Sequence, residues 1–363
     1  MECVKVDLVT VTYKNRDGRT VEVEVDPDDS SILDLSHKKI SSIDLESVVA
    51  IPGLTKLDLS RNTFTHPLDL SPLSSCKTLE SLDLFKNQFD QVDLTPLKGC
   101  KSLTELNLGA NNLSEIDLSP LKGHTNLRRI RLFNNQLSDV DITPLAKCTG
   151  LEYLEIESNA LTEIDLSPLA GCSALKQLNL MYNQLTNIDL SPLSSCLGLH
   201  FLYLHHNKLQ DIDLSPLASC TKLRILRLAG NQLSEVDLKP LNTCRALRRV
   251  GLAMNRIEEI DLSPLVKATE LSFLDIAGNR LKEVDLTPLS GCTSLSELYL
   301  HSDHPTDNEF GSLDLTPLFG CPDLEDLTVS DSTRLVADSK YSKGKGIPYA
   351  LEELADEGRI HWE

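Results

Sequence analysis

Leucine recurs at a nearly constant interval along most of this chain. The first step between block-opening leucines spans 25 residues, the next nine span 24 and the last spans 29. A degenerate unit around Leu33 and Leu35 precedes them. Such a period predicts an array of repeats, each burying its leucines against its neighbours instead of in one closed core. The opening leucines are Leu54, Leu79, Leu103, Leu127, Leu151, Leu175, Leu199, Leu223, Leu247, Leu271, Leu295 and Leu324.

The first half of each block alternates inward leucines with outward polar residues, which is the periodicity of a strand. An asparagine follows the strand in ten blocks. Its side chain carries both donors and an acceptor, so we expect it to satisfy backbone groups along the stack. These residues are Asn62, Asn87, Asn111, Asn135, Asn159, Asn183, Asn207, Asn231, Asn255 and Asn279.

The second half of each block follows the pattern I/V-D-L-S/T-P-L-x-x-C. Proline suits the first position of a helix, where its missing N–H costs nothing, and Ser or Thr is a favoured N-cap. We therefore expect a short helix or 3₁₀ turn to begin at each proline on the convex side. Lys239 replaces the Ser or Thr before Pro240, so that turn should be less well capped.

The whole pattern resembles the leucine-rich-repeat consensus L-x-x-L-x-L-x-x-N-x-L over about residues 30–330. The stretch from Asn135 to Leu145 is similar to the short repeats of internalins and of leucine-rich phosphatase regulators. No leader sequence is visible and a cysteine recurs in most repeats, which are two departures from internalins. The resemblance implies an α/β repeat solenoid, a right-handed curved superhelix with a concave parallel β-sheet and short convex helices or 3₁₀ turns.

Three domains are expected from these patterns. Residues 1–30 form an N-terminal β-hairpin cap, because residues 2–26 alternate around a turn at Asn15–Gly18. Residues 31–331 form the solenoid of about 13 repeats. Residues 332–363 form a C-terminal cap with a helix or helical turn after Pro348.

Nine of the ten cysteines occupy one repeat position, and only Cys3 lies outside it. Neighbouring repeats about 5 Å apart could bring sulfur atoms close, but parallel side chains in an odd number cannot pair completely. Zinc ligands usually come in paired C-x₂-C spacings, which this chain lacks. We therefore expect a reduced structural ladder, with His124 and Ala268 in the same slot, made of Cys76, Cys100, Cys148, Cys172, Cys196, Cys220, Cys244, Cys292 and Cys321.

A second ladder consists of aspartates. Like charges at this spacing repel, so the row should be a hydrogen-bonded or solvated edge, with binding of a cation such as Ca²⁺ as the alternative. No metal site is expected elsewhere, and the cluster of His301, Asp303, His304, Asp307 and Glu309 is interpreted as a solvated surface loop. The ladder aspartates are Asp44, Asp69, Asp93, Asp117, Asp141, Asp165, Asp189, Asp213, Asp237, Asp261, Asp285 and Asp314.

The outward strand positions differ from repeat to repeat, so they are where a partner can be recognised. They hold eight of the sixteen aromatic residues, which a leucine core does not need there. Tyr, Phe, Met and Arg are enriched at interface centres. We place the hot spot at Tyr153 to Arg227 and predict that the partner binds Arg129, Arg131, Phe133, Tyr153, Glu155, Met181, Tyr182, Phe201, Tyr203, His205, Arg227, Arg249, Phe273 and Tyr299.

Two details of this face concern neighbouring side chains. Arg129 and Arg131 either pair with Glu155 and Glu157 across repeats or orient a charged partner. His205 and His206 are adjacent, so they should diverge on a strand.

The chain is predicted to be a non-catalytic protein-protein interaction scaffold without a cofactor. No catalytic motif is present. The net charge of -19 and pI of 4.9 disfavour nucleic acid and membrane surfaces. The N-terminus does not resemble a signal peptide, so a cytoplasmic location is expected. The partner is a protein or peptide, weak self-association stays open, and the alternative is an extracellular adhesin or receptor-type ligand-binding domain.

Overall fold

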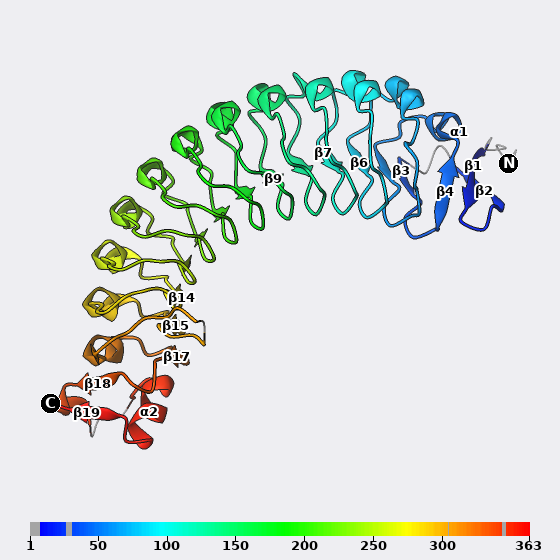
Figure 1. Ribbon diagram of the computed structural model, residues 1–363. Coiled ribbons are helices and arrows are strands. Elements are labelled where there is room, and N and C mark those ends of the chain that lie inside the picture. The colour runs from blue at the N-terminus through cyan, green and yellow to red at the C-terminus, as the bar shows by residue number, and fades with distance from the viewer. Residues whose placement is uncertain (1–7, 27–30, 304, 343–345) are drawn as a thin grey trace, which may run out of the picture. The chain divides into compact units, whose positions relative to one another are not determined.

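The computed structural model describes residues 8–26, 31–303, 305–342 and 346–363. Two compact units make up the chain, residues 1–175 and residues 176–363. In each unit the parallel strands lie along the inner side of the coil and the short 3₁₀ turns along the outer side (Figure 1). This arrangement is the predicted α/β repeat solenoid.

The first unit contains six described parallel strands, one per repeat, each three residues long. They pair in register with their neighbours, for example Leu82 with Leu106. These strands are β3 (Ile32–Asp34), β5 (Lys56–Asp58), β6 (Ser81–Asp83), β7 (Glu105–Asn107), β8 (Arg129–Arg131) and β9 (Tyr153–Glu155). Helix α1 (Leu45–Val49) precedes the 3₁₀ turns Ser71–Ser75, Thr95–Gly99, Ser119–Leu121, Thr143–Lys147 and Ser167–Gly171.

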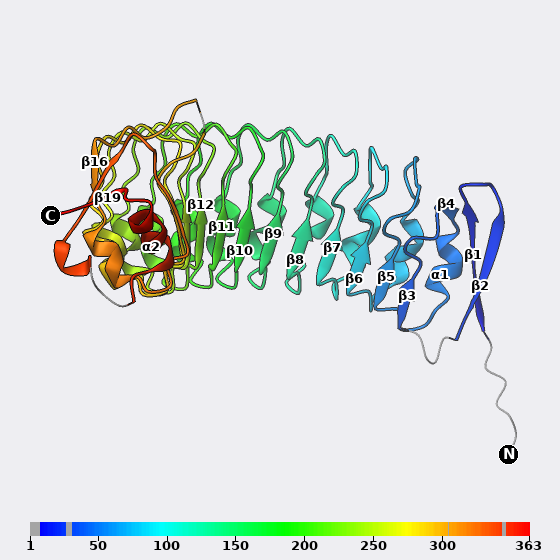
Figure 2. The same cartoon turned by 90° about the horizontal axis from the view of Figure 1, so that it is seen from below.

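A β-hairpin stands before the first repeat, as expected. Strands β1 (Val9–Asn15) and β2 (Thr20–Val25) pair antiparallel, and β4 (Ile40–Ile43) pairs with the other edge of β1 (Figure 2). Asn15 Oδ1 accepts the N–H groups of Asp17 and Arg19 and closes the turn. The remainder of the expected cap, residues 1–7 and 27–30, lies outside the described residues.

The second unit continues the same pattern with seven described parallel strands. These are β10 (Gln177–Asn179), β11 (Phe201–Tyr203), β12 (Ile225–Arg227), β13 (Arg249–Gly251), β14 (Phe273–Asp275), β15 (Glu297–Tyr299) and β17 (Asp326–Thr328). The 3₁₀ turns are Ser191–Ser195, Ser215–Ser219, Lys239–Thr243, Ser263–Lys267, Thr287–Gly291, Thr316–Gly320 and Ser339–Tyr341.

The end of the second unit has a different sheet and a helix. Strands β16 (Ser312–Asp314), β18 (Arg334–Ala337) and β19 (Ile360–Trp362) form a three-stranded parallel sheet. Helix α2 (Tyr349–Asp356) buries Leu351 and Leu354, and its Ala350 N–H donates to the Leu324 carbonyl at 3.2 Å. The expected helical C-cap is therefore present.

Leucines and asparagines hold the repeats together. The strand leucines are almost completely buried, and removing such side chains from water is the main stabilising term. Asn111 shows the asparagine role: Nδ2 donates to the Leu84 and Leu108 carbonyls at 3.1 and 3.0 Å, and Oδ1 accepts the Phe89 N–H. Asn308 makes equivalent bonds beyond the five-residue insertion, which hid it from the sequence pattern.

The nine cysteines of the ladder are buried and in register. The Cys100 thiol, for example, donates to the Leu73 carbonyl at 3.2 Å. Burial raises the pKa of Cys148 and of Cys172 to about 11. These thiols pack as small apolar side chains, in keeping with the predicted structural ladder. His124 fills the same slot and is fully buried.

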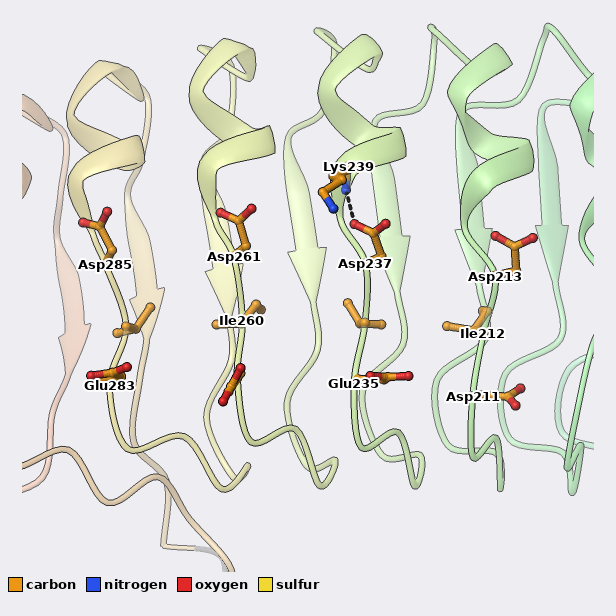
Figure 3. A pocket seen from close by; sticks show the side chains of 13 residues that line it. Asp211, Ile212, Asp213, Glu235, Asp237, Lys239, Ile260, Asp261, Glu283 and Asp285 are labelled. Atoms are coloured by element: carbon orange, nitrogen blue, oxygen red, sulfur yellow. Dashed lines mark hydrogen bonds between the residues drawn. The ribbon is translucent and has the colours of Figure 1, made fainter.

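The caps of the 3₁₀ turns differ from the expectation. The Ser or Thr side chain makes no capping bond; the ladder aspartate two residues earlier accepts its backbone N–H instead, as Asp213 does for Ser215 at 2.8 Å. Lys239 therefore does not weaken the capping of its turn, because its own N–H donates to Asp237 at 2.9 Å (Figure 3). The aspartate row is a hydrogen-bonded edge, and the prediction of a weaker turn at Lys239 was wrong.

Candidate protein-binding surfaces

The outward positions of the strands form rows that cross each unit. On the first unit, Arg131 pairs with Glu155 at 2.9 Å and Arg129 lies 3.8 Å from Glu105. The Arg129 guanidinium also covers the Tyr153 ring at 4.0 Å. Arg129 and Arg131 are thus engaged across repeats, although Arg129 uses Glu105 and not Glu157.

Aromatic rings cover the strand ends of the first unit. Phe85 and Phe133 lie 5.7 Å apart, and Gly109 occupies the corresponding position after β7 in the repeat between them. A Cβ on Gly109 would stand 2.7 Å from the Phe133 ring, so glycine lets the ring lie against the backbone. Phe133 and Tyr153 are half-buried and form a firm, partly apolar surface.

Glu157 follows β9 and is the unusual carboxylate of the first unit. Its Oε2 atom is buried and has no hydrogen-bond partner. Burial raises the pKa of Glu157 to about 7, and the nearby Glu155 acts in the same direction. A side chain in this state is half protonated near neutral pH.

On the second unit, the residues after β10 and β11 form a cluster of rings. Tyr182 stacks on His206 at 4.4 Å and meets His205 edge-on at 5.8 Å. His205 also meets Tyr203, and Phe201 lies parallel to Tyr203. Burial, followed by His206 and Arg227, lowers the pKa of His205 to about 4, so this ring is neutral at pH 7.

His205 and His206 do not diverge, contrary to the expectation. The strand ends at Tyr203, and His206 adopts a left-handed backbone conformation with φ of 55°. Tyr182 and Met254 do the same in their repeats. A residue in this left-handed turn directs its side chain outward. This explains why Tyr182 and Met254 are among the few large hydrophobic residues that are exposed.

A second cluster centres on Phe273. The guanidinium groups of Arg227 and Arg249 lie 4.4 and 4.1 Å from its ring, and Tyr299 meets it edge-on. Arg249 also pairs with Glu297 at 3.3 Å. Phe273 is only 6% exposed. Phe273 therefore lies beneath the two guanidinium groups, and its contact with a partner stays a prediction.

The structure places the other predicted residues on the strand-lined faces. Arg129, Arg131, Phe133, Tyr153 and Glu155 lie on the first unit. Met181, Tyr182, Phe201, Tyr203, His205, Arg227, Arg249 and Tyr299 lie on the second. All are half-buried except Tyr182, which is exposed. The predicted hot spot therefore consists of one surface on each unit.

Sequence reasoning missed the residues just before each strand. Lys176, Arg224 and Arg248 occupy this position in three repeats, and His200 occupies it in a fourth. Backbone hydrogen bonds fix them in one row, since the Arg224 carbonyl accepts the N–H groups of Arg248 and Arg249. Their common charge at a fixed repeat position was the available signal.

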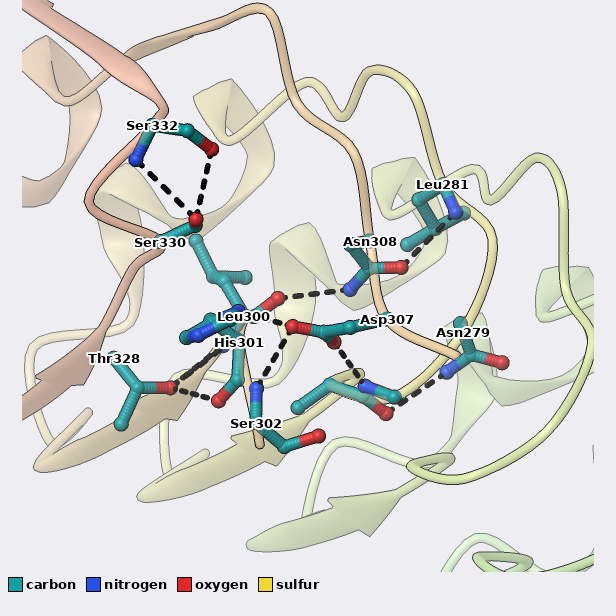
Figure 4. Close-up of polar contacts among 12 residues, drawn as sticks. Asn279, Leu281, Leu300, His301, Ser302, Asp307, Asn308, Thr328, Ser330 and Ser332 are labelled. Atoms are coloured by element: carbon teal, nitrogen blue, oxygen red, sulfur yellow. Dashed lines mark hydrogen bonds and ion pairs between the residues drawn. The ribbon is translucent and has the colours of Figure 1, made fainter. Parts of the chain in front are cut away.

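Asp307 in the insertion of the second unit is bound to the backbone and is not solvated as expected. Asp307 is only 12% exposed in its side chain and accepts the N–H groups of Gly278 at 2.7 Å and Ser302 at 3.0 Å (Figure 4). Its carboxylate also contacts the His301 ring. Asp307 thus closes the loop onto the preceding repeat, while His304 lies outside the described residues.

Carboxylates gather on the flank of the second unit. They line a shallow groove and come from the ladder position and from the position two residues before it (Figure 3). No group of three or more His, Cys, Asp or Glu in the described part of the chain is arranged to hold a metal ion. No described helix has the length and apolar character to cross a membrane.

Comparison with known families identifies the repeats. A model described as "Leucine rich repeat" matches residues 77–137, 125–185 and 149–209, and one described as "Leucine Rich repeats (2 copies)" matches residues 197–240. A search of curated protein sequences returned no match.

Solved structures with the same fold include bacterial and plant proteins. An internalin (inlF) of Listeria monocytogenes is 28% identical, with a TM-score of 0.61 over 85% of this chain and 90% of that one. The functional domain of InlJ from the same organism, which includes a cysteine ladder, is 24% identical, with a TM-score of 0.65 over 88% of this chain and 70% of that one. A cysteine ladder therefore does not set this chain apart from InlJ.

A plant receptor domain has a similar fold at greater length. The leucine-rich-repeat ectodomain of the membrane receptor kinase GASSHO1/SCHENGEN3 from Arabidopsis thaliana, in complex with CASPARIAN STRIP INTEGRITY FACTOR 2, is 23% identical. Its TM-score is 0.69 over 92% of this chain and 41% of that one.

Proposed function

Because the chain is a leucine-rich-repeat protein, we propose that it is a non-catalytic scaffold that binds a protein partner on its strand-lined faces. One observation carries this proposal. The core is filled by leucine, yet Phe201, Tyr203 and Arg227 stand half-buried at outward strand positions. Large side chains of these types, partly ordered by one another before binding, are what interface centres use.

The test compares two variants in neighbouring repeats. The double variant F201A/Y203A should capture its partner several-fold more weakly from an extract of the cells that make the protein. The control L197A removes an exposed leucine beyond the 3₁₀ turn of the preceding repeat and should bind like the wild type. Melting curves should be nearly unchanged for both. Equal capture by F201A/Y203A and the wild type would remove the proposal.

The alternative is an extracellular adhesin or receptor-type domain, which the likeness to an internalin favours. We propose the cytoplasmic location because nine buried thiols in one register form no natural set of pairs. Titrating thiols in the unfolded protein from its native source separates the two. Nearly all ten cysteines should react; a majority already oxidised would favour the extracellular role.

A further inference from the structure

A basic strip crosses the strand-lined face of the second unit. We define it as Lys176, Arg224, Arg227, Arg248 and Arg249, which stand on or directly before β10, β12 and β13. His200 continues the same row before β11. Five cations on three of four neighbouring strands are unexpected in a chain whose net charge is -19.

Strands β10 to β13 supply no carboxylate to the strip. Besides Arg227 and Arg249, the outward positions of β10 to β13 hold two aromatic residues, two amides, an isoleucine and a glycine, and no carboxylate. Carboxylates lie instead on the flank, where Asp211, Glu235 and Glu259 belong to the same repeats. The charges of these repeats are therefore sorted, with cations on the face and anions on the flank.

Two of the arginines have no ion-pair partner within the described residues. Arg248 pairs with Glu270 at 2.8 Å and Arg249 with Glu297 at 3.3 Å, but Arg224 and Arg227 pair with no carboxylate there. Arg227 is half-buried against the Phe273 ring and over Gly251, where a Cβ would come within 3.0 Å of its Cδ. Its guanidinium is held in place, and an ordered guanidinium suits bidentate binding of a carboxylate.

The geometry points to an acidic segment of a protein partner as the occupant of β10 to β13. This inference rests on the proposed function and adds the chemistry of the partner. Neighbouring strands lie ~4.8 Å apart, so the four strands span ~15 Å, which about five residues of extended chain would cross. Carboxylates of such a segment would form ion pairs with the guanidinium groups of Arg224 and Arg227, and its apolar side chains would contact Phe201 and Tyr203.

An acidic protein fits this surface better than a nucleic acid does. The strands beyond β13 carry carboxylates, with Asp275 on β14, Glu297 on β15 and Asp326 on β17. A phosphate backbone is charged at every nucleotide and would meet them as soon as it left the strip. A short acidic stretch confined to the strip avoids that repulsion.

The experiment measures binding of three short fluorescent peptides to the full chain by anisotropy. The three peptides share one pattern of apolar residues and glycine. At the alternating positions, one peptide carries glutamate, the second glutamine and the third lysine. The glutamate peptide should bind about tenfold more tightly than the glutamine peptide, and added salt should weaken it. The variant R224Q/R227Q should lose about tenfold in affinity for it.

The control variant R245Q/R256Q removes the same charge from exposed arginines of the same unit. Its affinity for the glutamate peptide should stay at the wild-type value, and both variants should melt like the wild type. Equal affinity for the glutamate and glutamine peptides, no binding of the glutamate peptide, or an unaffected R224Q/R227Q would each overturn the inference. Tighter binding of the lysine peptide would overturn it in favour of a basic partner on the acidic flank.

Two further comparisons separate the possible failures. If single-stranded RNA binds more tightly than the glutamate peptide and R224Q/R227Q abolishes its binding, the occupant is a nucleic acid and the inference fails. If none of the peptides binds while F201A/Y203A still loses the cellular partner, the face binds a protein but has no preference for acidic segments. If F201A/Y203A also has no effect, the proposed function fails too.

Discussion

At the residue scale, burial sets the properties of one carboxyl group in the first unit. The Glu157 pKa of about 7 lies above the ordinary value of 4.5 because burial penalises the charged form. Between pH 4.5 and about pH 7, Glu157 therefore keeps its proton in the folded protein and releases it in the unfolded chain. This group's stabilising contribution is complete below pH 4.5 and is lost as pH rises through 7.

The variant E157Q should remove this pH dependence, because a neutral amide cannot ionise. Its melting temperature should exceed that of the wild type at a pH above 7 and differ little near pH 4.5. Thermal melts by circular dichroism across this range measure the effect. E163Q changes an exposed glutamate of the same repeat and should show no such trend. A difference between wild type and E157Q that is constant with pH would mean that the pKa of Glu157 is the same in the folded and unfolded states.

At the element scale, each 3₁₀ turn depends on a carboxylate outside it. Asp213 accepts the Ser215 N–H and hydroxyl, both at 2.8 Å. Replacing it in D213A leaves an unpaired N–H and should lower the free energy of unfolding by about 1 kcal/mol, the usual cost of losing a cap. Urea denaturation measures this loss.

Two controls distinguish the aspartate from the residue that follows it. S215A keeps the bond between Asp213 and the backbone N–H, so it should cost less than D213A. K239S should leave stability unchanged, because Asp237 binds the backbone of residue 239 and not its side chain. A stabilising effect of K239S would restore the Ser or Thr side chain as the cap.

Elements that repeat could be predicted from the sequence, and elements that break the repeat could not. The strand leucines, the asparagines and the cysteine slot follow from periodicity, because each repeat meets a nearly identical neighbour. Asn308 was missed because the insertion moves it out of register. Asp307 was taken for part of a solvated loop because nothing in its local sequence shows that Gly278, 29 residues away, donates to it.

The candidate surfaces were predictable only as positions. Alternation correctly puts Phe201, Tyr203 and Arg227 outward, since a strand exposes every second residue. Alternation does not show that the arginines cover Phe273, because that depends on how long side chains lie across two strands. It also fails at His206, where the strand has already ended in a left-handed turn.

At the scale of the whole molecule, the net charge influences thermal stability. A net charge of -19 repels itself, and on the second unit the aspartate ladder runs beside a second acidic row. Monovalent salt screens exposed charges that are ~10 Å apart at ~0.1 M. The melting temperature should therefore rise with added sodium chloride, and a calorimetric series at fixed pH would measure this increase.

The same series separates screening from cation binding. The ladder aspartates already accept backbone N–H groups, as Asp237 and Asp261 do at 2.9 and 2.8 Å. Neighbouring rows are also too regular to converge on one ion, which needs six or more oxygens around it. Calcium and magnesium chloride at matched ionic strength should thus give the same melting temperature, and a chelator should not change it. A rise with calcium alone would show that the ladder binds the ion, because screening does not distinguish two divalent cations of equal charge.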